Sequence, residues 1–391
     1  MKKILIFILI VVCFLSSGLS TFAVSDTKNA AESSRTNAAE LGVEVGSAYL
    51  IEARTGKVLY AENEFSAASP ASVTKVMTLL LVCEALDAGK FDLKDTVTVS
   101  AHAASMGGSQ IFLEEGERMT VEDLIKSTVI ASGNDSAVAL AELTAGSEAA
   151  FVKLMNKRAL ELGLKKTSFE NTTGLDDTTT NHYTCAADIA AMSRELIKHE
   201  IILKYSSIWQ DTIRNGEFTL TNTNRLVRYY EGCNGLKTGS TDKAGYCISA
   251  TAKRGNMQLI AVIMGAKSRD DRNQAARELL DFGFANFALY ERGEEFIENC
   301  DVLGGVKDSV ALYSRPFSCV VDKSKISEVE LIYDIPESLS ATITEGDVVG
   351  GIIYKVDGNQ IGKSDIYSSE SVEKITLPQI FARILKRIAC G

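Results

Sequence analysis

Residues 70–82 are PASVTKVMTLLLV, and this stretch decides how the rest of the sequence is interpreted. Apolar residues recur three and four positions apart, which predicts a helix that begins near Val73, with Pro70 just upstream and Ser72 as its N-cap. On such a helix Ser72 and Lys75 share one face, so the lysine amine can reach the serine hydroxyl. A serine hydroxyl becomes a nucleophile only when a base takes its proton. A neutral lysine can be that base when burial or a nearby cation lowers its pKa.

Ser-x-x-Lys is a weak signal by itself, because a serine that caps a helix often has a solvated lysine one turn later. The sequence holds three further copies, at 25–28, 240–243 and 371–374. These lie in a polar N-terminal segment, at the end of a predicted strand and in a polar stretch near the C-terminus. Only the copy that starts at Ser72 begins a strongly apolar helical run. We therefore take Ser72 and Lys75 as the candidate nucleophile and base.

Two other short motifs lie where a cleft could form beside that helix. Ser-Gly-Asn at 132–134 interrupts a helical block where one helix ends and the next begins, so it can present a hydroxyl and a carboxamide. Lys-Thr-Gly at 237–239 precedes a strand hairpin and can offer an ammonium group, a hydroxyl and closely approaching backbone at a sheet edge. Each motif alone is compatible with an ordinary turn. Their order after Ser-x-x-Lys predicts one shared site.

The regions around these motifs predict an α+β domain, with an antiparallel sheet beside a cluster of helices. Two hairpins open and close it, and their strands are predicted over residues 47–53 and 58–61, then 247–252 and 257–264. Apolar periodicity predicts a helix at 121–131, capped by Thr120. Further helices are predicted from 136 onward, at 188–198 and at 274–287.

The N-terminal residues differ from this domain. Residues 1–23 combine two lysines, an apolar run and a small-residue end, which predicts a secretory signal cleaved after Ala23. An uncleaved membrane anchor is the alternative, although the run is shorter than the roughly 20 residues that span a bilayer. Residues 24–41 are polar without apolar periodicity, and we expect a flexible linker there. The catalytic domain is then predicted at 42–288.

The C-terminal part changes character twice. Short strand-like runs separated by turns predict a small all-β domain at 289–374. Residues 375–391 carry apolar side chains at helical spacing, with basic residues mostly off that stripe: Leu377, Ile380, Phe381, Ile384 and Ile388. Such a helix is typical of segments that lie on a membrane surface, and packing against the β domain is the alternative.

Composition excludes several classes of function. The chain has 391 residues and a formal net charge of −10, so it lacks the basic field that nucleic-acid binding needs. The eight cysteines form no Cys-x-x-Cys pair, and no His, Cys and carboxylate cluster has metal-ligand spacing, so we expect no metal and no cofactor. Cys13 would leave with the signal. We expect most of the other cysteines to be buried free thiols.

Together the motifs resemble a known pattern. The triplet is the signature of penicillin-binding proteins and serine β-lactamases. Residues 40–375 resemble the low-molecular-mass D,D-carboxypeptidases, the penicillin-binding protein 5-like family (peptidase S11). Beyond the triplet, the resemblance rests on PASVTK at 70–75, FENTTGL at 169–175, HYT followed by AADIAAMSREL at 182–196, NTNRL at 222–226, and GLKTGST followed by AGY at 235–246.

The resemblance implies a transpeptidase-like α+β domain and an enzyme that removes the terminal D-alanine from peptidoglycan stem pentapeptides through an acyl-enzyme. It also implies acylation by β-lactam antibiotics and a location at the extracytoplasmic face of the cell membrane or cell wall. In the family's mechanism Ser72 attacks, and Lys75 is the base for acylation. Ser132, together with Lys237, passes a proton to the leaving D-alanine.

The resemblance also implies the substrate-binding residues. Asn134 holds the acyl peptide, and Gly239 lets the strand backbone approach closely. Thr238 and Arg272 bind the terminal carboxylate, with Arg269 as a rival for the second role. The N–H groups of residues 72 and 240 form the oxyanion hole. Family members usually carry histidine where this chain has Ser240, which puts leaving-group handling and pH response in doubt.

Other activities stay open. A D,D-endopeptidase, a transpeptidase or a β-lactamase would use the same fold, although the β domain and basic tail argue against a freely diffusing lactamase. A catalytically silent wall-binding protein is the alternative from another class. A Ser-His-Asp hydrolase is not expected, because the chain has three histidines and no Gly-x-Ser-x-Gly. We expect His182 to be structural.

Overall fold

The computed structural model describes residues 44–177 and 179–390. The predicted signal at 1–23 and the predicted linker at 24–41 both lie outside the described residues. Within the described part, no helix is both long enough and apolar enough to cross a membrane.

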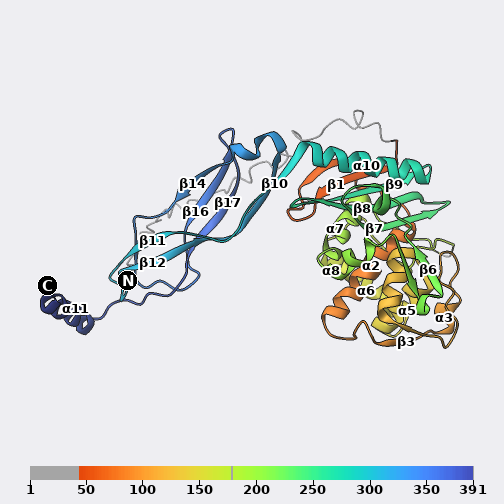
Figure 1. The fold of residues 1–391 in the computed structure, drawn as a ribbon, viewed down its shortest axis with the longest axis horizontal. Coiled ribbons are helices and arrows are strands. Elements are labelled where there is room, and N and C mark those ends of the chain that lie inside the picture. Colours follow the sequence, from red (N-terminus) through yellow and green to blue (C-terminus); the bar gives the residue numbers. More distant parts are fainter. Residues whose placement is uncertain (1–43, 178, 391) are drawn as a thin grey trace, which may run out of the picture. The chain divides into compact units, whose positions relative to one another are not determined.

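A five-stranded antiparallel sheet forms the centre of the first domain (Figure 1). The first and last hairpins predicted from the sequence meet in it, because β1 pairs with β9. The strand order is β2 (Val58–Glu62), β1 (Ser47–Glu52), β9 (Met257–Ala266), β8 (Gly245–Arg254) and β7 (Cys233–Thr241). The Lys-Thr-Gly motif therefore lies on an edge strand, as the sequence predicted.

Both faces of this sheet are covered, because its side chains alternate between two apolar cores. Leu259, Ala261 and Ile263 of β9 belong to the core beneath α10 (Arg269–Asn286). Their neighbours Ile260 and Val262 belong to the larger core on the opposite face. Figure 1 shows α10 along one face of the sheet and the other helices on the opposite side. The period of two along β9 is the pattern of a strand buried on both sides.

The helical cluster fills the larger core. Its helices are α2 (Lys75–Asp87), α4 (Val121–Lys126), α5 (Asn134–Ala145), α6 (Glu148–Glu161), α7 (Ala186–Leu196) and α8 (Glu200–Ser206), with the short α3 (Ala101–Ala104) and α9 (Leu226–Tyr229). Two small hairpins complete it: β3 (Thr96–Thr98) with β4 (Arg118–Thr120), and β5 (Gln210–Ile213) with β6 (Phe218–Thr221), the latter pair flanking a 3-10 turn at Arg214–Gly216.

The sequence predicted the helix ends with mixed success. Thr120 caps α4 as predicted, since its hydroxyl accepts a hydrogen bond from the N–H of Asp123. The predicted helix at 121–131 continues beyond α4 as a π-helix at Ser127–Ala131. The closing helix α10 begins at Arg269, five residues before the predicted start, because Ser268 caps it.

The predicted N-cap at Ser72 is wrong. Ser72 lies inside a 3-10 turn, Ala71–Thr74, that precedes α2, and no side chain caps either element. Ala71 takes a left-handed conformation with φ 47°, which lets the chain enter this turn tightly. The Ser72 hydroxyl is therefore free of backbone capping and accepts a hydrogen bond from the Lys75 amine.

The second domain consists of β-strands around a small apolar core of its own. A six-stranded sheet has the order β14 (Glu330–Asp334), β16 (Val348–Val356), β17 (Asn359–Ser368), β12 (Ser309–Ser314), β11 (Glu295–Leu303) and β15 (Ser338–Ser340). A separate pair joins β10 (Phe287–Arg292) and β13 (Phe317–Asp322), which a 3-10 turn at Lys323–Glu328 follows. Asp357 and Gly358 form the predicted turn between β16 and β17, both with positive φ.

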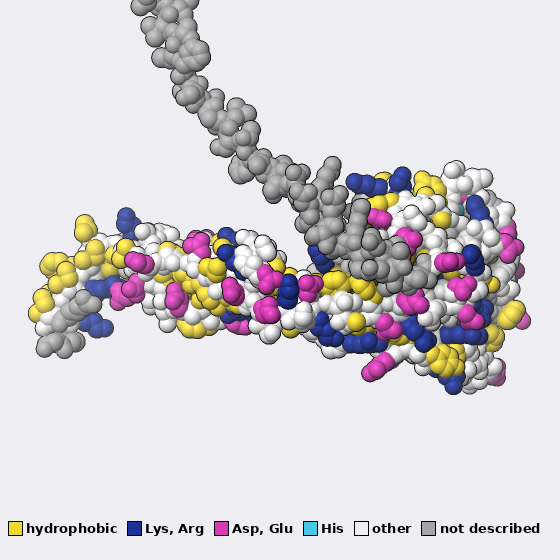
Figure 2. All heavy atoms as spheres, turned by 90° about the horizontal axis from the view of Figure 1, so that it is seen from above, with side chains coloured by type: hydrophobic (Ala, Val, Ile, Leu, Met, Phe, Trp, Pro, Cys, Tyr) yellow, Lys and Arg dark blue, Asp and Glu magenta, His cyan; other side chains and the backbone are white. Residues whose placement is uncertain are grey.

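The last helix, α11 (Leu377–Cys390), confirms the predicted amphipathic segment. Arg383 donates hydrogen bonds to Asp308 Oδ1 at 2.7 Å and to the Val306 carbonyl oxygen at 2.6 Å. The apolar stripe is exposed and does not pack on the β domain: Leu377, Ile380, Phe381, Ile384, Leu385 and Ile388. Figure 2 shows apolar side chains gathered on this helix, at the left end of the view.

The described cysteines fit the expectation of free thiols. Cys83, Cys185, Cys233, Cys247 and Cys300 are buried and unpaired, and Cys319 is half-buried and unpaired. Burial raises the pKa of Cys185 to about 11, which keeps that thiol protonated and unreactive.

Candidate active site

Ser72 and Lys75 lie in contact at the start of α2. Lys75 Nζ lies 3.0 Å from Ser72 Oγ, and it donates to Asn134 Oδ1 at 2.5 Å and to the Thr173 carbonyl oxygen at 2.9 Å. The lysine side chain is completely buried. Burial, together with the charge of Lys237, holds the pKa of Lys75 well below its usual value. The neutral amine, which can take the proton of a serine hydroxyl, is therefore favoured.

A second serine–lysine pair lies opposite the first. Ser132 follows the π-helix with a left-handed backbone, φ 66°, and this turn directs its hydroxyl toward β7. Lys237 Nζ donates to Ser132 Oγ and to the Thr238 carbonyl oxygen, both at 2.8 Å. Lys237 is also buried, and burial with the nearby charge of Arg272 lowers its pKa to about 7. At neutral pH this amine can therefore either give or take a proton.

Gly239 brings the two pairs together. A Cβ at this position would lie 2.7 Å from the backbone nitrogen of Ser72 and 2.9 Å from that of Val73. No side chain fits at that separation, so only glycine lets β7 lie backbone against backbone on the turn that carries Ser72. Three motifs far apart in the sequence thus meet at one place.

A cleft of about 590 Å³ opens beside this contact. Six of the predicted site residues line it: Ser72, Ser132, Thr238, Gly239, Ser240 and Arg272. The other three predicted residues, Lys75, Asn134 and Lys237, are buried behind the lining and hydrogen-bond to it or to one another. In the part of the chain that the structure describes, no group of three or more His, Cys, Asp or Glu side chains could hold a metal ion.

Arg272 and its rival Arg269 both line the cleft, but they differ in burial. Arg272 lies in the first turn of α10, is 3% exposed, and hydrogen-bonds to Asn273 Oδ1 without forming a salt bridge to any described residue. Burial, and then the charge of Arg269, lower its pKa to about 10. Arg269 is exposed. A buried guanidinium without a carboxylate partner is costly, so a bound anion would stabilise Arg272 most.

Asn134 and His182 are both held in place by hydrogen bonds to neighbouring protein groups. Asn134 orients Lys75 with its oxygen and donates from Nδ2 to the Gly107 carbonyl oxygen at 2.7 Å. His182 accepts from the N–H of Glu170 at Nδ1, which leaves its proton on Nε2 for Thr74 Oγ1 at 2.8 Å. This contact ties His182 to the turn of Ser72 but not to the hydroxyl, in line with the structural role expected from the sequence.

Some residues of the cleft were missed by the sequence analysis. The Thr173 carbonyl holds Lys75, and Thr223 Oγ1 accepts from Thr238 Oγ1 at 2.8 Å. Both lie in the segments FENTTGL and NTNRL that carried the resemblance, so a signal existed. The contact of Thr173 is made by its backbone, however, and leaves no preference for a side chain. Trp209 and Arg225 also line the cleft. Arg225 also lies in NTNRL, although no role was predicted for it, and nothing in the local sequence singled out Trp209.

Comparisons with known proteins follow this geometry. A family model described as D-alanyl-D-alanine carboxypeptidase matches residues 33–268, and one described as the C-terminal domain of penicillin-binding protein 5 matches residues 284–374. The chain belongs to the D-alanyl-D-alanine carboxypeptidase family. It is 44% identical over 382 residues to D-alanyl-D-alanine carboxypeptidase DacF of Bacillus subtilis (strain 168), a match that covers 96% of this chain and 95% of that protein.

Solved structures of the same kind are similar to this carboxypeptidase. Penicillin-binding protein 5 from Haemophilus influenzae is 33% identical with a TM-score of 0.75, and the match covers 85% of this chain and 98% of that one. Penicillin-binding protein D2 from Listeria monocytogenes, solved in an ampicillin-bound form, is 30% identical with a TM-score of 0.58, over 62% of this chain and 99% of that one. The predicted family, fold class and enzyme class are therefore confirmed.

Proposed function

We propose that this carboxypeptidase removes the terminal D-alanine from peptidoglycan stem pentapeptides through an acyl-enzyme on Ser72. One observation carries the proposal: the Ser72 hydroxyl lies 3.0 Å from the amine of a completely buried lysine whose pKa is lowered. A weak nucleophile beside a base whose neutral form is favoured by burial is the arrangement that acyl transfer needs. Family membership supports the choice of substrate.

In the acylation step, Lys75 takes the hydroxyl proton while the bond between Ser72 Oγ and the peptide carbonyl carbon forms. The carbonyl oxygen becomes negatively charged, and the N–H groups of Ser72 and Ser240 stabilise it. Loss of one such donor typically costs about 10²- to 10³-fold in rate. A serine at position 240 supplies the same backbone N–H as the histidine usual in the family.

The leaving D-alanine needs a proton on its nitrogen when the peptide C–N bond breaks. Ser132 gives its hydroxyl proton to that nitrogen, and Lys237, 2.8 Å away, replaces it. A pKa of about 7 for Lys237 suits this role, because both protonation states are populated near neutral pH. Water then cleaves the ester, restores the Ser72 hydroxyl and releases the shortened peptide.

The remaining predicted residues bind substrate. Arg272 and Thr238 hold the terminal carboxylate, and Gly239 lets the peptide approach the β7 backbone. Asn134 holds the acyl peptide with the one amide hydrogen that its bond to Gly107 leaves over. β-Lactams acylate the same serine, since they mimic the D-alanyl-D-alanine end. The ampicillin-bound relative supports this part of the proposal.

The protein acts on the extracytoplasmic side, because its substrate is wall peptidoglycan. The signal at 1–23 exports it, and the exposed apolar stripe of α11 lies on the membrane surface. We propose the linker at 24–41, the catalytic domain at 42–288, the β domain at 289–374 and the helical segment at 375–391. The two family models match residues 33–268 and 284–374, which supports the division between the catalytic domain and the β domain.

Ser72→Ala tests the proposal. It should abolish D-alanine release from a stem pentapeptide and covalent labelling by fluorescent penicillin, with folding checked by circular dichroism. Ser109→Ala is the matched control, because Ser109 also lines the cleft but has no lysine amine bonded to its hydroxyl among the described residues. It should keep both activities.

Retained labelling of Ser72→Ala would remove Ser72 from the nucleophile's role. Two other outcomes with wild-type protein would redirect the assignment. Rapid turnover of the penicillin adduct would favour a β-lactamase. Binding of D-alanyl-D-alanine peptides without release of D-alanine would favour a silent wall-binding protein.

A further inference from the structure

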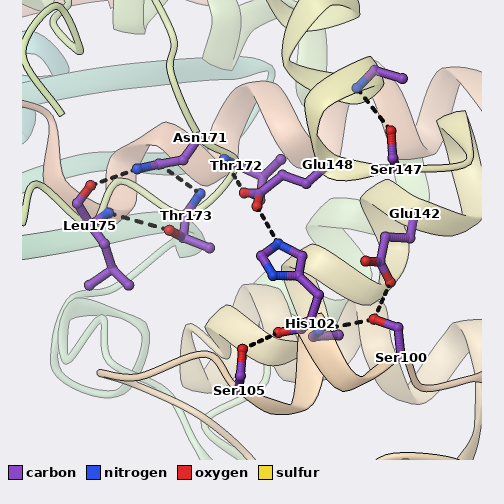
Figure 3. A network of polar contacts seen from close by, with 12 residues as sticks. Ser100, His102, Ser105, Glu142, Ser147, Glu148, Asn171, Thr172, Thr173 and Leu175 are labelled. Atoms are coloured by element: carbon purple, nitrogen blue, oxygen red, sulfur yellow. Dashed lines mark hydrogen bonds and ion pairs between the residues drawn. The ribbon is translucent and has the colours of Figure 1, made fainter. Parts of the chain in front are cut away.

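Glu148 forms hydrogen bonds to two separate chain segments from the N-terminus of α6 (Figure 3). Its Oε1 accepts from the N–H of Thr172 at 3.0 Å and from Thr172 Oγ1 at 2.8 Å. Its Oε2 lies 2.8 Å from His102 Nε2. The carboxylate side chain is 17% exposed and its bonds to Thr172 are partly buried, so water can replace few of those bonds, whereas the contact with His102 is exposed. A carboxylate is also favourable in the first turn of a helix, because the helix dipole is positive there.

The first segment, residues 171–175, holds Lys75. The Thr172 carbonyl oxygen accepts a hydrogen bond from Thr78 Oγ1 at 2.7 Å. The carbonyl oxygen of the next residue, Thr173, accepts one from Lys75 Nζ. Asn171 closes the loop by accepting from the N–H of Gly174 at 2.7 Å. The loop is pressed against the nucleophile's turn, since a Cβ on Gly174 would lie 1.8 Å from the Ala71 carbonyl oxygen.

The second segment holds Asn134, the other partner of Lys75. His102 lies in α3, and the chain that follows α3 binds Asn134. The Gly107 carbonyl oxygen accepts from Asn134 Nδ2, and the Ser109 carbonyl oxygen accepts from the N–H of Asn134, both at 2.7 Å. Asn134 Oδ1 then accepts from Lys75 Nζ. Of the three acceptors around the Lys75 amine, the Thr173 carbonyl therefore lies in one segment that Glu148 binds, and Asn134 Oδ1 is held in place by the other.

We propose that Glu148 is a positioning residue for acylation, which fixes the Thr173 carbonyl and the loop beside Asn134 so that the Lys75 amine points at Ser72. This inference rests on the proposed function, and it assigns to that reaction a residue about which the motifs say nothing. Glu148 touches neither Lys75 nor Ser72. It acts through Thr172 on one side and His102 on the other.

The physical reason is the orientation of the Lys75 lone pair. A buried amine has few partners, so the acceptors that remain decide where its hydrogens point and where its lone pair is left. Without Glu148, two donors of Thr172 lose their partner, and the loop that carries the Thr173 carbonyl is free to shift. Misplacement of a reacting group by about 1 Å can cost on the order of 100-fold in rate.

Three variants test the idea. Glu148→Ala removes the carboxylate. Glu148→Gln keeps an oxygen that accepts from Thr172 and an amide that lies within reach of His102 Nε2. Glu142→Ala is the matched control, because Glu142 also holds the α3 segment, through Ser100 Oγ at 2.7 Å, but forms no hydrogen bond to the described residues of 171–175 (Figure 3). The readout is the second-order rate constant for labelling of Ser72 by fluorescent penicillin, measured across pH.

We expect Glu148→Ala to slow acylation about 10- to 100-fold. Glu148→Gln and Glu142→Ala should stay within about threefold of wild type. The acid limb of the pH profile should move to lower pH in Glu148→Ala by more than in Glu148→Gln. The reason is that loss of the Thr173 carbonyl destabilises the ammonium form of Lys75, whereas both variants lose the same carboxylate charge.

Two outcomes would overturn the inference: acylation by Glu148→Ala as fast as by Glu142→Ala at every pH, or Glu148→Gln as impaired as Glu148→Ala. If Glu148→Ala does not fold, Thr172→Val removes one of the two bonds to Glu148 at constant volume. It should slow acylation several-fold without lowering the final extent of labelling, and an unchanged rate would contradict the idea. Failure of the proposed function is distinct, because wild-type protein would then not be labelled at all.

Discussion

The catalytic cleft and the C-terminal β domain place their basic side chains in opposite environments. Lys75, Lys237 and Arg272 are buried around the cleft, and none of the three forms a salt bridge with a described residue. In the β domain the cations lie near the surface beside acids, as in Lys307 with Glu370. Burial of an unpaired cation opposes folding, whereas an exposed pair is nearly neutral for it. Burial in the cleft thus lowers the pKa values of Lys75 and Lys237, which makes their amines reactive at the expense of stability.

The largest expected effect breaks that comparison at Lys75. Lys75→Met should slow acylation by fluorescent penicillin about 1,000-fold, because Ser72 then lacks its general base. Lys307→Met, in the β domain, should leave the rate unchanged. Equal rates for Lys75→Met and wild type would show that the buried amine is not the base.

Arg272 and Arg269 sharpen the comparison within the cleft. Arg272→Gln should lower kcat/KM for D-alanine release about 100-fold, mainly through KM, because a buried charge contact to the substrate carboxylate is lost. Arg269→Gln should change it by no more than about threefold, since an exposed charge contact contributes little. The reverse ranking, measured by steady-state kinetics, would give the carboxylate to Arg269.

His182 extends the comparison to acid stability. Burial lowers the pKa of His182 to about 4, whereas an unfolded histidine has a pKa of about 6.5. Between these values only the unfolded chain takes up the proton, so stability present above pH 6.5 is lost as the pH falls toward 4. The loss between pH 7 and pH 5 should be on the order of 2 kcal/mol.

Urea unfolding followed by tryptophan fluorescence measures this loss, since the single tryptophan, Trp209, lies in the catalytic domain. His182→Gln should lose less stability than wild type over the same pH range. The β domain contains no histidine, so its stability should show no loss of this kind between pH 7 and pH 5. An equal loss in the variant would contradict the assignment to His182.

The smallest expected effect concerns α11. Phe381→Ala should weaken binding to anionic lipid vesicles about tenfold, because one exposed apolar side chain no longer enters the interface. Release of D-alanine from a soluble peptide should not change. Vesicle flotation checks the prediction, and unaltered binding would mean that the stripe serves another purpose.

The sequence predicted those parts of the molecule that depend on local pattern. Alternation and turn residues placed the strands, and apolar periodicity placed most helices. The three motifs gave the residues of the cleft because each carries a side chain that chemistry requires. The N-cap prediction at Ser72 failed because Ser72 lies inside a 3-10 turn before α2, and its hydroxyl accepts a hydrogen bond from the Lys75 amine three residues later.

Other features could not be predicted, because they depend on contacts between distant segments. The Thr173 carbonyl acts through backbone that any residue supplies. Arg272 is buried because α10 begins at Arg269. The sequence did not predict this start, because the residues there are charged and show no apolar periodicity. Glu148 looked like an ordinary first-turn acid, and only its two partners in space distinguish it.

Gly239 limits the ways in which this enzyme can evolve. The strand and the nucleophile's turn meet there without an intervening side chain, so the width of the cleft is fixed by the chain itself. A single added methyl group would push β7 away from the turn that carries Ser72, and so move the two serine–lysine pairs apart from each other. Adaptation to new ligands is thereby confined to the rim, at positions such as Trp209, Arg225 and Ser240, while the central spacing is inherited unchanged.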